Sequence, residues 1–356
     1  MSEPGPEQIT AVNRGLLSSA TLGAGEGPSQ GPEARWGRGL PSWGGLFERY
    51  GLLVVWALVV ALFSGLSPSH FPTTVNFQTI FGTQAVLLVL TLGLLVSLTV
   101  SEYDLSVASL MGFSSVMVGE LSAVLHLPMV VAVLGAVGCG LAIGAINAFL
   151  VVRVGVSSFI ATLGTGTLLT GLSYGVSGSV TIGGIPGGLT AATNHQLGGL
   201  PLVFFYGVIL CIIVWYVFSY TPLGRHLVFV GEGREVARLT GLPVARLRAG
   251  ALVVCSLVAS LAGILQAGVV GAADPSGGTA YLLPAFAAAF LGATAIRPGR
   301  FNPWGTFVAV YFLVTGITGL ELLGLSGWVQ DVFYGGALVI AVALGRIAGS
   351  SRGARA

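Results

Sequence analysis

The sequence predicts an all-α polytopic membrane protein with about ten transmembrane helices. Hydrophobic residues make up 54% of the 356 residues and charged residues only 8%, whereas a soluble domain carries roughly 25% charged residues. The mean hydropathy is +0.90. The apolar runs are continuous and lack the period-2 alternation of barrel strands. A water-facing domain and a transmembrane β-barrel are therefore both disfavoured.

A helix needs about 20 apolar residues to cross the hydrocarbon core, and ten segments meet or approach that length. The expected spans are 50–66, 79–99, 105–125, 128–152, 156–178, 201–220, 249–270, 283–296, 305–323 and 328–346. The segment 283–296 is short and rich in glycine and alanine, so we expect a partial span there. Clusters of glycine and threonine at 164–167 and 315–319 predict interruptions within two spans. The longest loop of the opposite side, 179–200, is expected to be polar and flexible.

The cationic side chains predict the orientation of the chain. All fifteen are arginine, and each lies before the first span or after an even-numbered one. The first span is preceded by Arg14, Arg35, Arg38 and Arg49, and the fourth is followed by Arg153. The sixth span is followed by Arg225, Arg234, Arg238, Arg246 and Arg248, and the eighth by Arg297 and Arg300. At or beyond the end of the tenth span lie Arg346, Arg352 and Arg355. Cytoplasmic loops retain positive charge, so both termini are expected in the cytoplasm.

The ends of the chain differ from its middle in composition. Residues 1–47 are rich in glycine, proline, serine and glutamate without a sustained apolar period, which is typical of a disordered tail. The stretch lacks the basic start, apolar core and cleavage site of a signal peptide. We therefore expect a cytoplasmic tail over 1–47, a membrane domain over 48–346 and a short cytoplasmic tail over 347–356.

The longest basic loop, 221–248, contains a candidate docking element. Residues 232–239 can form a short helix that Gly241 and Pro243 end. A charged helix presented between two spans suits contact with a cytoplasmic partner. The same arginines also fit an ordinary loop that follows the positive-inside rule, and the charge pattern leaves both interpretations open.

Polar residues inside or beside the spans are candidates for a solute pathway. Ionisable groups at membrane depth are costly and usually face a cavity or a partner. Glu102 and Asp104 lie between the second and third spans, where they either contact solute or cap the third span. The residues assigned to a translocation path are Gln84, Asp104, Asn147, Thr162, Thr165 and Gln266. Each of the uncharged ones can equally form an interhelical hydrogen bond.

Several kinds of chemistry are disfavoured. A Walker A loop needs its lysine to reach the phosphates, and the sequence contains none. The four histidines and three cysteines show no metal-ligand spacing, so we predict no metal site and no bound cofactor. The Gly171–Gly175 match to a nucleophile elbow lies within an apolar span and is interpreted as chance. Nucleic-acid binding is disfavoured because topology already explains the arginines.

Four groups of motifs, in order along the chain, resemble the permease subunits of ribose-type ABC sugar importers of the branched-chain amino acid/ribose permease superfamily. They are Tyr103–Ser109; Gly144–Asn147 with Ser158–Gly164; Thr221–Arg225 with Glu235, Ala237, Arg238, Gly241 and Leu242–Val244; and Ser260–Gly263, Leu291–Thr294 and Gly305–Thr306. The resemblance covers roughly residues 50–345. Ala108, Ala148 and Ser158 depart from the usual residues. Residues 295–304 also depart from the glycine-rich turn of that family.

The resemblance implies a role for the basic loop. Residues 231–243 would form the coupling helix that docks on a separate ATP-binding subunit, through Gly231, Arg234, Glu235, Ala237, Arg238 and Gly241. ATP would be used by that subunit. A solute-binding protein outside the cytoplasm would deliver a monosaccharide or similar polar solute, and a second permease copy or a homologous permease would complete the path. The expected location is the bacterial plasma (inner) membrane.

Two alternatives remain open at this point. An ion-coupled secondary transporter also uses broken helices, with Glu102, Asp104, Glu120, Glu321 and Asp331 as its candidate carboxylates. A branched-chain amino acid permease is the alternative within the ABC class. An intramembrane enzyme is the weakest interpretation, since the sequence offers no convincing nucleophile.

Overall fold

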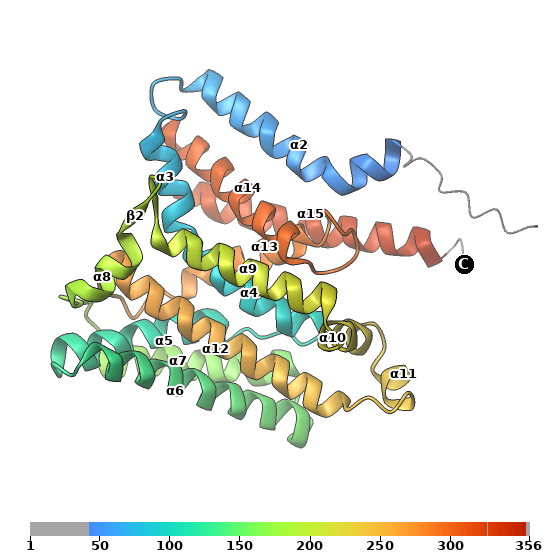
Figure 1. Cartoon of the computed structure of the whole chain (residues 1–356), viewed down its shortest axis with the longest axis horizontal. Helices are drawn as coiled ribbons and strands as arrows, with labels where there is room; N and C mark the ends of the chain where they lie inside the picture. The colour runs from blue at the N-terminus through green and yellow to red at the C-terminus, as the bar shows by residue number, and fades with distance from the viewer. Residues whose placement is uncertain (1–42, 326, 354–356) are drawn as a thin grey trace, which may run out of the picture. The chain divides into compact units, whose positions relative to one another are not determined.

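The computed structural model describes residues 43–325 and 327–353, and within them it is almost wholly helical (Figure 1). The α-helices are α2 (Trp43–Leu66), α3 (Thr74–Thr83), α4 (Ala85–Thr99), α5 (Val107–Gly119), α6 (Met129–Ala148), α7 (Ser158–Ser177), α8 (Gly187–Asn194), α9 (Leu202–Tyr220), α10 (Pro222–Glu232), α11 (Arg234–Leu239), α12 (Val244–Val270), α13 (Leu282–Gly292), α14 (Pro303–Leu322) and α15 (Trp328–Gly353). Helices α5 and α6 each continue into a π-helical turn, η1 (Glu120–Val124) and η2 (Phe149–Val154), and a 3₁₀ turn, η3 (Thr279–Tyr281), precedes α13.

The prediction of an all-α polytopic membrane protein is confirmed. Eight helical segments of the described residues are long and apolar enough to cross a membrane, and two shorter apolar helices cover Thr279–Gly292 and Trp328–Ala343. Each of the ten expected spans coincides with one of these segments. The total of ten crossings and the cytoplasmic termini remain predictions.

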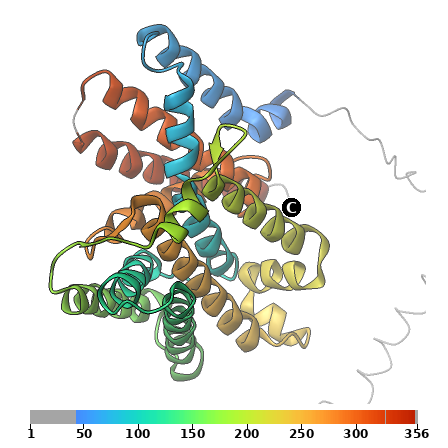
Figure 2. The ribbon, with the colours of Figure 1, turned by 60° about the vertical axis from the view of Figure 1, so that its left-hand side comes forward.

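Helix α4 lies in the middle of the helix bundle (Figures 1 and 2). Every one of its residues, Ala85–Thr99, is buried, as expected of a helix that is hydrophobic all round. Helix α12 packs against α4, α5 and α6, and α13 packs against α14 and α15. The outer helices expose large apolar side chains such as Leu58, Leu134 and Val339. Such surfaces suit lipid contact and would be unstable in water.

The expected interruptions of two spans do not occur. Helices α7 and α14 run without a break through the glycine and threonine clusters. The hydroxyls of Thr167, Thr170 and Thr315 donate to carbonyls one turn earlier in the same helix, and glycine loses no hydrogen bond there. The axis is instead irregular at Gln84, between α3 and α4, and at the two π-helical turns.

The expected boundaries shift in several places. Helix α2 begins at Trp43 and α15 continues to Gly353, so both extend beyond the limits set for the membrane domain; residues 1–42 lie outside the described residues. The loop 179–200, expected to be polar and flexible, contains regular secondary structure. It contains α8 and the strands β1 (Ile182–Gly183), β2 (Gln196–Leu197) and β3 (Leu200–Pro201). Strand β1 pairs antiparallel with β4 (Ala272–Ala273), and β2 pairs antiparallel with β3.

The crossing of α13 and α14 explains the two glycines of the motifs Leu291–Thr294 and Gly305–Thr306. A Cβ at Gly305 would lie 2.2 Å from the carbonyl oxygen of Gly292, so only glycine allows the two backbones to approach this closely. Asn302 holds the preceding loop, because its amide donates to the carbonyls of Gly292 and Ala295 while its Oδ1 accepts from Gly305 N at 2.7 Å. The divergent segment 295–304 therefore has a defined path.

Candidate functional site

We call the end of the bundle that carries Arg49, Arg153, Arg225–Arg248 and Arg297–Arg300 the arginine-rich end. Here the basic loop 221–248 forms two helices, α10 and α11, joined at Gly233, and α12 begins at Val244. The short helix starts at Arg234, two residues later than expected. Thr221 caps α10, since its hydroxyl accepts from Gly224 N at 3.2 Å.

Helix α11 has one buried side and one exposed side. Ala237 is fully buried and belongs to the hydrophobic core, and Leu242 packs against that core just beyond the helix. Glu235 and Arg238 are 78% and 73% exposed and pair with each other at 3.4 Å. Leu239 is 84% exposed. The exposed side therefore combines an ion pair with bare apolar surface, a composition that suits docking to a protein partner.

Two glycines place α11, and they do so in different ways. Gly231 packs against the end of α4, where an added Cβ would lie 2.0 Å from the carbonyl oxygen of Thr99. Gly241 has φ +83°, a left-handed conformation that ends the helix and turns the chain into α12. Both were predicted to contact an ATPase. The geometry gives each a role within this chain.

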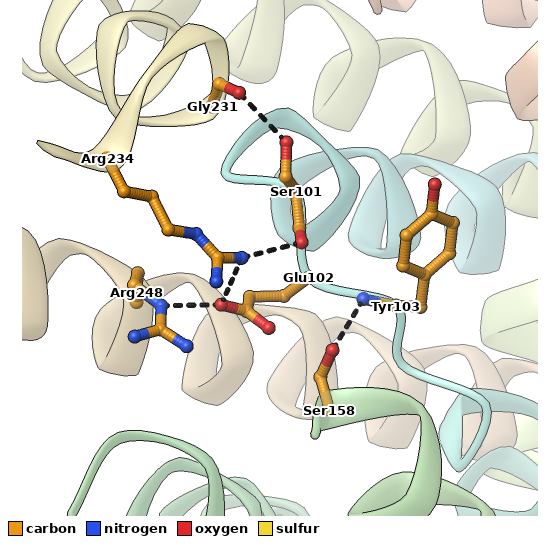
Figure 3. Close-up of polar contacts among 7 residues, drawn as sticks. All are labelled: Ser101, Glu102, Tyr103, Ser158, Gly231, Arg234 and Arg248. Carbon is orange, nitrogen blue, oxygen red and sulfur yellow. Dashed lines mark hydrogen bonds and ion pairs between the residues drawn. The ribbon is translucent and has the colours of Figure 1, made fainter. Parts of the chain in front are cut away.

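The buried carboxylate of Glu102 ties α11 to the loop between α4 and α5 (Figure 3). Glu102 is 2% exposed, and its Oε1 accepts from Arg234 Nη2 at 2.8 Å and from Arg248 Nε at 2.5 Å. Arg234 also donates to the carbonyl of Ser101 at 2.8 Å, and Ser101 Oγ donates to the carbonyl of Gly231 at 3.0 Å. A buried charge is tolerated only when it is paired and hydrogen-bonded, and here two arginines from separate helices satisfy it.

We call the contact of Glu102 with Arg234 and Arg248 the Glu102 clamp. Beside it, four of the residues predicted for a translocation path lie in one buried network. Thr165 Oγ1 donates to Asn147 Oδ1, Asn147 Nδ2 donates to Ser106 Oγ, and Ser106 Oγ donates to Asp104 Oδ1, at 2.9, 2.9 and 2.6 Å. Thr162 Oγ1 accepts from Leu105 N at 2.9 Å. The network joins α6 and α7 to the start of α5. The members of this network form hydrogen bonds with one another, which is typical of interhelical contacts.

Asp104 is the unusual member of this network. It is fully buried, and its Oδ2 forms no hydrogen bond within the described residues. Burial raises the pKa of the Asp104 carboxyl, although the hydrogen bonds from Ser106 oppose that effect. The thiol of Cys255 on α12 also interacts with this carboxyl and opposes the rise of its pKa. The environment therefore makes ionisation of Asp104 less favourable than in water.

The other two predicted path residues lie near a polar cavity at the opposite end of the bundle. This cavity of about 430 Å³ is formed by α4, α13, α14 and α15, and its lining includes Gln84, Thr279, Tyr281, Thr318, Glu321, Gln330, Asp331 and Tyr334. Its described lining residues include two carboxylates and no arginine. Gln266 does not line it but accepts a hydrogen bond from Tyr281 OH at 3.3 Å. The wall offers hydroxyl, amide and carboxylate groups, the usual partners of a hydroxyl-rich solute.

Sequence reasoning missed several residues of these sites. Glu102 was predicted to cap the third span, to contact solute or to serve an ion-coupled carrier, and Arg248 was assigned only to a basic loop. Their pairing joins positions 146 apart in the chain. Val236 and Leu239 on the exposed side of α11 were overlooked, although apolar residues flanked by charges in a basic loop could have indicated them. Tyr281 was overlooked as a polar contact because apolar residues flank it in the sequence.

The fold and these two polar regions define a polytopic helical membrane protein with a short, half-exposed helix at one end and a polar cavity at the other. The family described as the branched-chain amino acid transport system / permease component matches residues 76–342. The chain belongs to this family of transport permeases. It is a multi-pass protein of the bacterial inner membrane.

Three relatives are informative. The chain is 29% identical to the D-allose transport system permease protein AlsC of Escherichia coli K12, over 85% of this chain and 92% of the relative. It is 31% identical to the ribose import permease protein RbsC of the same organism, over 82% and 91%. It is 31% identical to the autoinducer 2 import system permease protein LsrD of Yersinia pseudotuberculosis, over 85% and 92%. No solved structure matches the chain. The resemblance to ABC sugar permeases is confirmed.

Proposed function

We propose that this chain forms the translocation path of an ATP-driven importer for a monosaccharide or similar hydroxylated solute. The carrying observation is the match over more than four fifths of both chains to permeases named for D-allose and ribose. The cavity supports the same solute class, because polar groups without cations line it. In this proposal the chain itself is non-catalytic and binds no cofactor, and ATP is hydrolysed by a separate subunit.

The solute would enter at the polar cavity. Gln84 lines the cavity directly, and Gln266 acts there through Tyr281. Asp104, Asn147, Thr162 and Thr165 are better explained as packing contacts, because their polar atoms are bonded mainly to one another. A solute-binding protein would deliver the solute to this end, and a second permease copy or a homologous permease would complete the path.

The ATP-binding subunit would dock on α11. The exposed side of this helix presents Glu235, Val236, Arg238 and Leu239, while Ala237 anchors it to the core. Glu102 makes α11 a rigid part of the bundle through Arg234 and Arg248. Movement of the docked subunit would therefore reach the start of α5 and the network around Asp104 directly. Gly231 and Gly241 contribute by setting the position of the helix.

Co-purification tests the partner. The protein is extracted from its native membrane in mild detergent as wild type, as Leu239→Arg and as Glu235→Lys, with Arg153→Gln as the control at the same end. An ATP-hydrolysing subunit is expected with the wild type and the control and is expected to be lost in the two α11 variants. Failure of any ATPase to accompany the wild type would overturn the proposal.

Uptake tests the solute class. Cells that carry the complete transporter are given radiolabelled D-ribose, D-allose or L-leucine. A sugar but not leucine is expected to accumulate, and Thr318→Trp, which fills the cavity, is expected to abolish accumulation. Val339→Trp on the lipid-facing side of α15 should leave it intact. Uptake of leucine alone would favour the branched-chain amino acid alternative, and uptake that survives loss of the ATPase would favour an ion-coupled carrier.

A further inference from the structure

A second pocket lies at the arginine-rich end, apart from both regions described above. Its volume is about 400 Å³, and it is formed by α2, α9, α10, the loop before α14 and the start of α14. Four arginines line it: Arg49, Arg225, Arg297 and Arg300. They come from three separate parts of the chain, so the convergence is a product of the fold. No residue of α11 belongs to the lining.

The positive charge of this pocket is largely uncompensated. Arg300 pairs with Glu232, the one carboxylate in the described lining, at 2.7 Å. Arg49 donates Nε to the carbonyl of Ile296 at 3.0 Å, and its terminal nitrogens form no hydrogen bond with a described residue. Arg225 and Arg297 form no ion pair with a described residue. Several guanidinium groups that converge without counter-charges are suited to an anion with phosphate geometry.

The wall of the pocket adds a second feature that points to a ligand. Ser219 Oγ is buried and has no hydrogen-bond partner among the described residues, so it is a donor still to be satisfied. The aromatic rings of Trp215 and Trp304 meet edge to face at 6.4 Å beside it. Tryptophan is enriched where hydrocarbon meets the headgroup layer. The pocket therefore combines basic, hydroxyl and interfacial aromatic groups.

The position of the pocket matches the depth of lipid headgroups. It lies where α9 ends and α14 begins, and both helices are long and apolar enough to span the membrane. Helix α10 buries Gly224, Leu227 and Val230 on one side, while Leu223 is 49% exposed and Phe229 is 36% exposed. The exposed apolar side chains of α10, at the end of a span, suit contact with acyl chains near the interface.

We propose that this pocket binds the phosphate group of an anionic phospholipid of the cytoplasmic leaflet. Basic pockets between transmembrane helices on that side are known to accept such headgroups. The divergent segment 295–304 supplies Arg297 and Arg300, so the site arises where this chain departs from the family it belongs to. A bound lipid would hold α2, α10 and the loop before α14 together.

The test compares two double variants of the full-length protein that remove equal charge at the same end. Arg225→Gln/Arg297→Gln alters the pocket, and Arg153→Gln/Arg246→Gln lies outside it. Each is purified in detergent and titrated with phosphatidylglycerol or phosphatidylcholine, with bound lipid counted by native mass spectrometry and stability followed by thermal unfolding. The wild type and the control double should retain phosphatidylglycerol in preference to phosphatidylcholine. The pocket double should lose about tenfold or more in apparent affinity.

Three outcomes would overturn the proposal. Equal losses in both doubles would indicate diffuse surface attraction only. Equal stabilisation by inorganic phosphate and by phosphatidylglycerol would assign the pocket to a free anion. Displacement of phosphatidylglycerol by the co-purified ATP-binding subunit would assign it to that partner. In phosphatidylcholine, the pocket double should unfold at the same temperature as the wild type, which checks that it is folded. The result does not depend on transport, so it stands apart from the test of the proposed function.

Discussion

The same three-residue turn occurs at both ends of this protein, in opposite surroundings. Asp104 Oδ1 accepts from Ser106 N at 3.0 Å and from Ser106 Oγ at 2.6 Å; Asp274 Oδ1 accepts from Ser276 N and Ser276 Oγ, both at 2.8 Å. Asp104 and Ser106 are fully buried at the arginine-rich end. Asp274 and Ser276 are exposed, and the chain after them leads to the polar cavity at Thr279. Local sequence thus sets the turn, and the tertiary surroundings decide what it does.

The contrast extends to the other carboxylates of the two ends. Glu102 is enclosed by two arginines, whereas Glu321 and Asp331 are exposed at the cavity and face no arginine of its described lining. One end is therefore held in a single geometry by charge and hydrogen bonds. The other end has exposed carboxylates, and Glu321 there accepts only from the neutral amide of Gln330, at 2.6 Å, among the described residues. The following variants test that difference, from the largest expected effect to the smallest.

Arg248→Met should cause the largest loss of stability. It leaves the buried Glu102 carboxylate with Arg234 alone, and breaking a buried ion pair from one side costs about 3 kcal/mol. Thermal unfolding in detergent measures the loss. The matched control is Glu232→Gln, which breaks the exposed Arg300–Glu232 pair and should cost no more than about 0.5 kcal/mol. Similar losses in the two variants would show that the Glu102 clamp carries no special weight.

Gly231→Ala should also weaken the arginine-rich end, because the new Cβ would lie 2.0 Å from the Thr99 carbonyl oxygen and force α10 away from α4. Overpacking of this kind costs about 2 kcal/mol. Gly233→Ala is the control two residues away, where the backbone is extended and the nearest atom lies at 3.8 Å. Chemical or thermal unfolding of the two proteins should separate them clearly. Equal stability would mean that the contact between α10 and α4 yields easily.

Glu321→Gln/Asp331→Asn should leave stability unchanged, since both carboxylates are exposed. If the cavity admits the solute, the double change should raise the KM for uptake about tenfold, as expected for the loss of one hydrogen bond to a charged group. Asp274→Asn, at the same end but outside the cavity lining, is the control. A fall in unfolding temperature comparable to that of Arg248→Met would erase the distinction between the two ends.

Asp104→Asn should change the pH dependence of stability more than stability itself. Burial raises the pKa of Asp104 in the folded protein, so the wild type should lose stability as pH rises through the folded-state pKa. The slope is at most about 1.4 kcal/mol per pH unit for one group. Asparagine does not titrate, and that part of the slope should vanish. Unfolding curves recorded across pH measure the slope, and Asp274→Asn, in the corresponding exposed turn, is the control. An unchanged slope in Asp104→Asn would contradict a raised pKa of the Asp104 carboxyl in the folded protein.

Much of the fold could be predicted because a bilayer restricts how a chain can satisfy its backbone. Spanning segments must be apolar and helical, so the ten expected spans coincide with helices of the structure. The short helix α11 was predicted to within two residues, since Gly241 and Pro243 end it locally. The interruptions expected in α7 and α14 were wrong, because glycine and threonine can remain helical when their hydrogen bonds are made within the helix.

Composition and pattern alone therefore determined the class, the apolar segments and the family motifs of this protein. Only the tertiary structure decided which polar residues meet. Asp104, Asn147 and Thr165 were predicted for a solute path but form one network between helices. Glu102 and Arg248 are 146 residues apart, and nothing in their local sequence indicates the pairing. Helical periodicity is a local property, whereas the partner of a buried charge depends on how the helices pack.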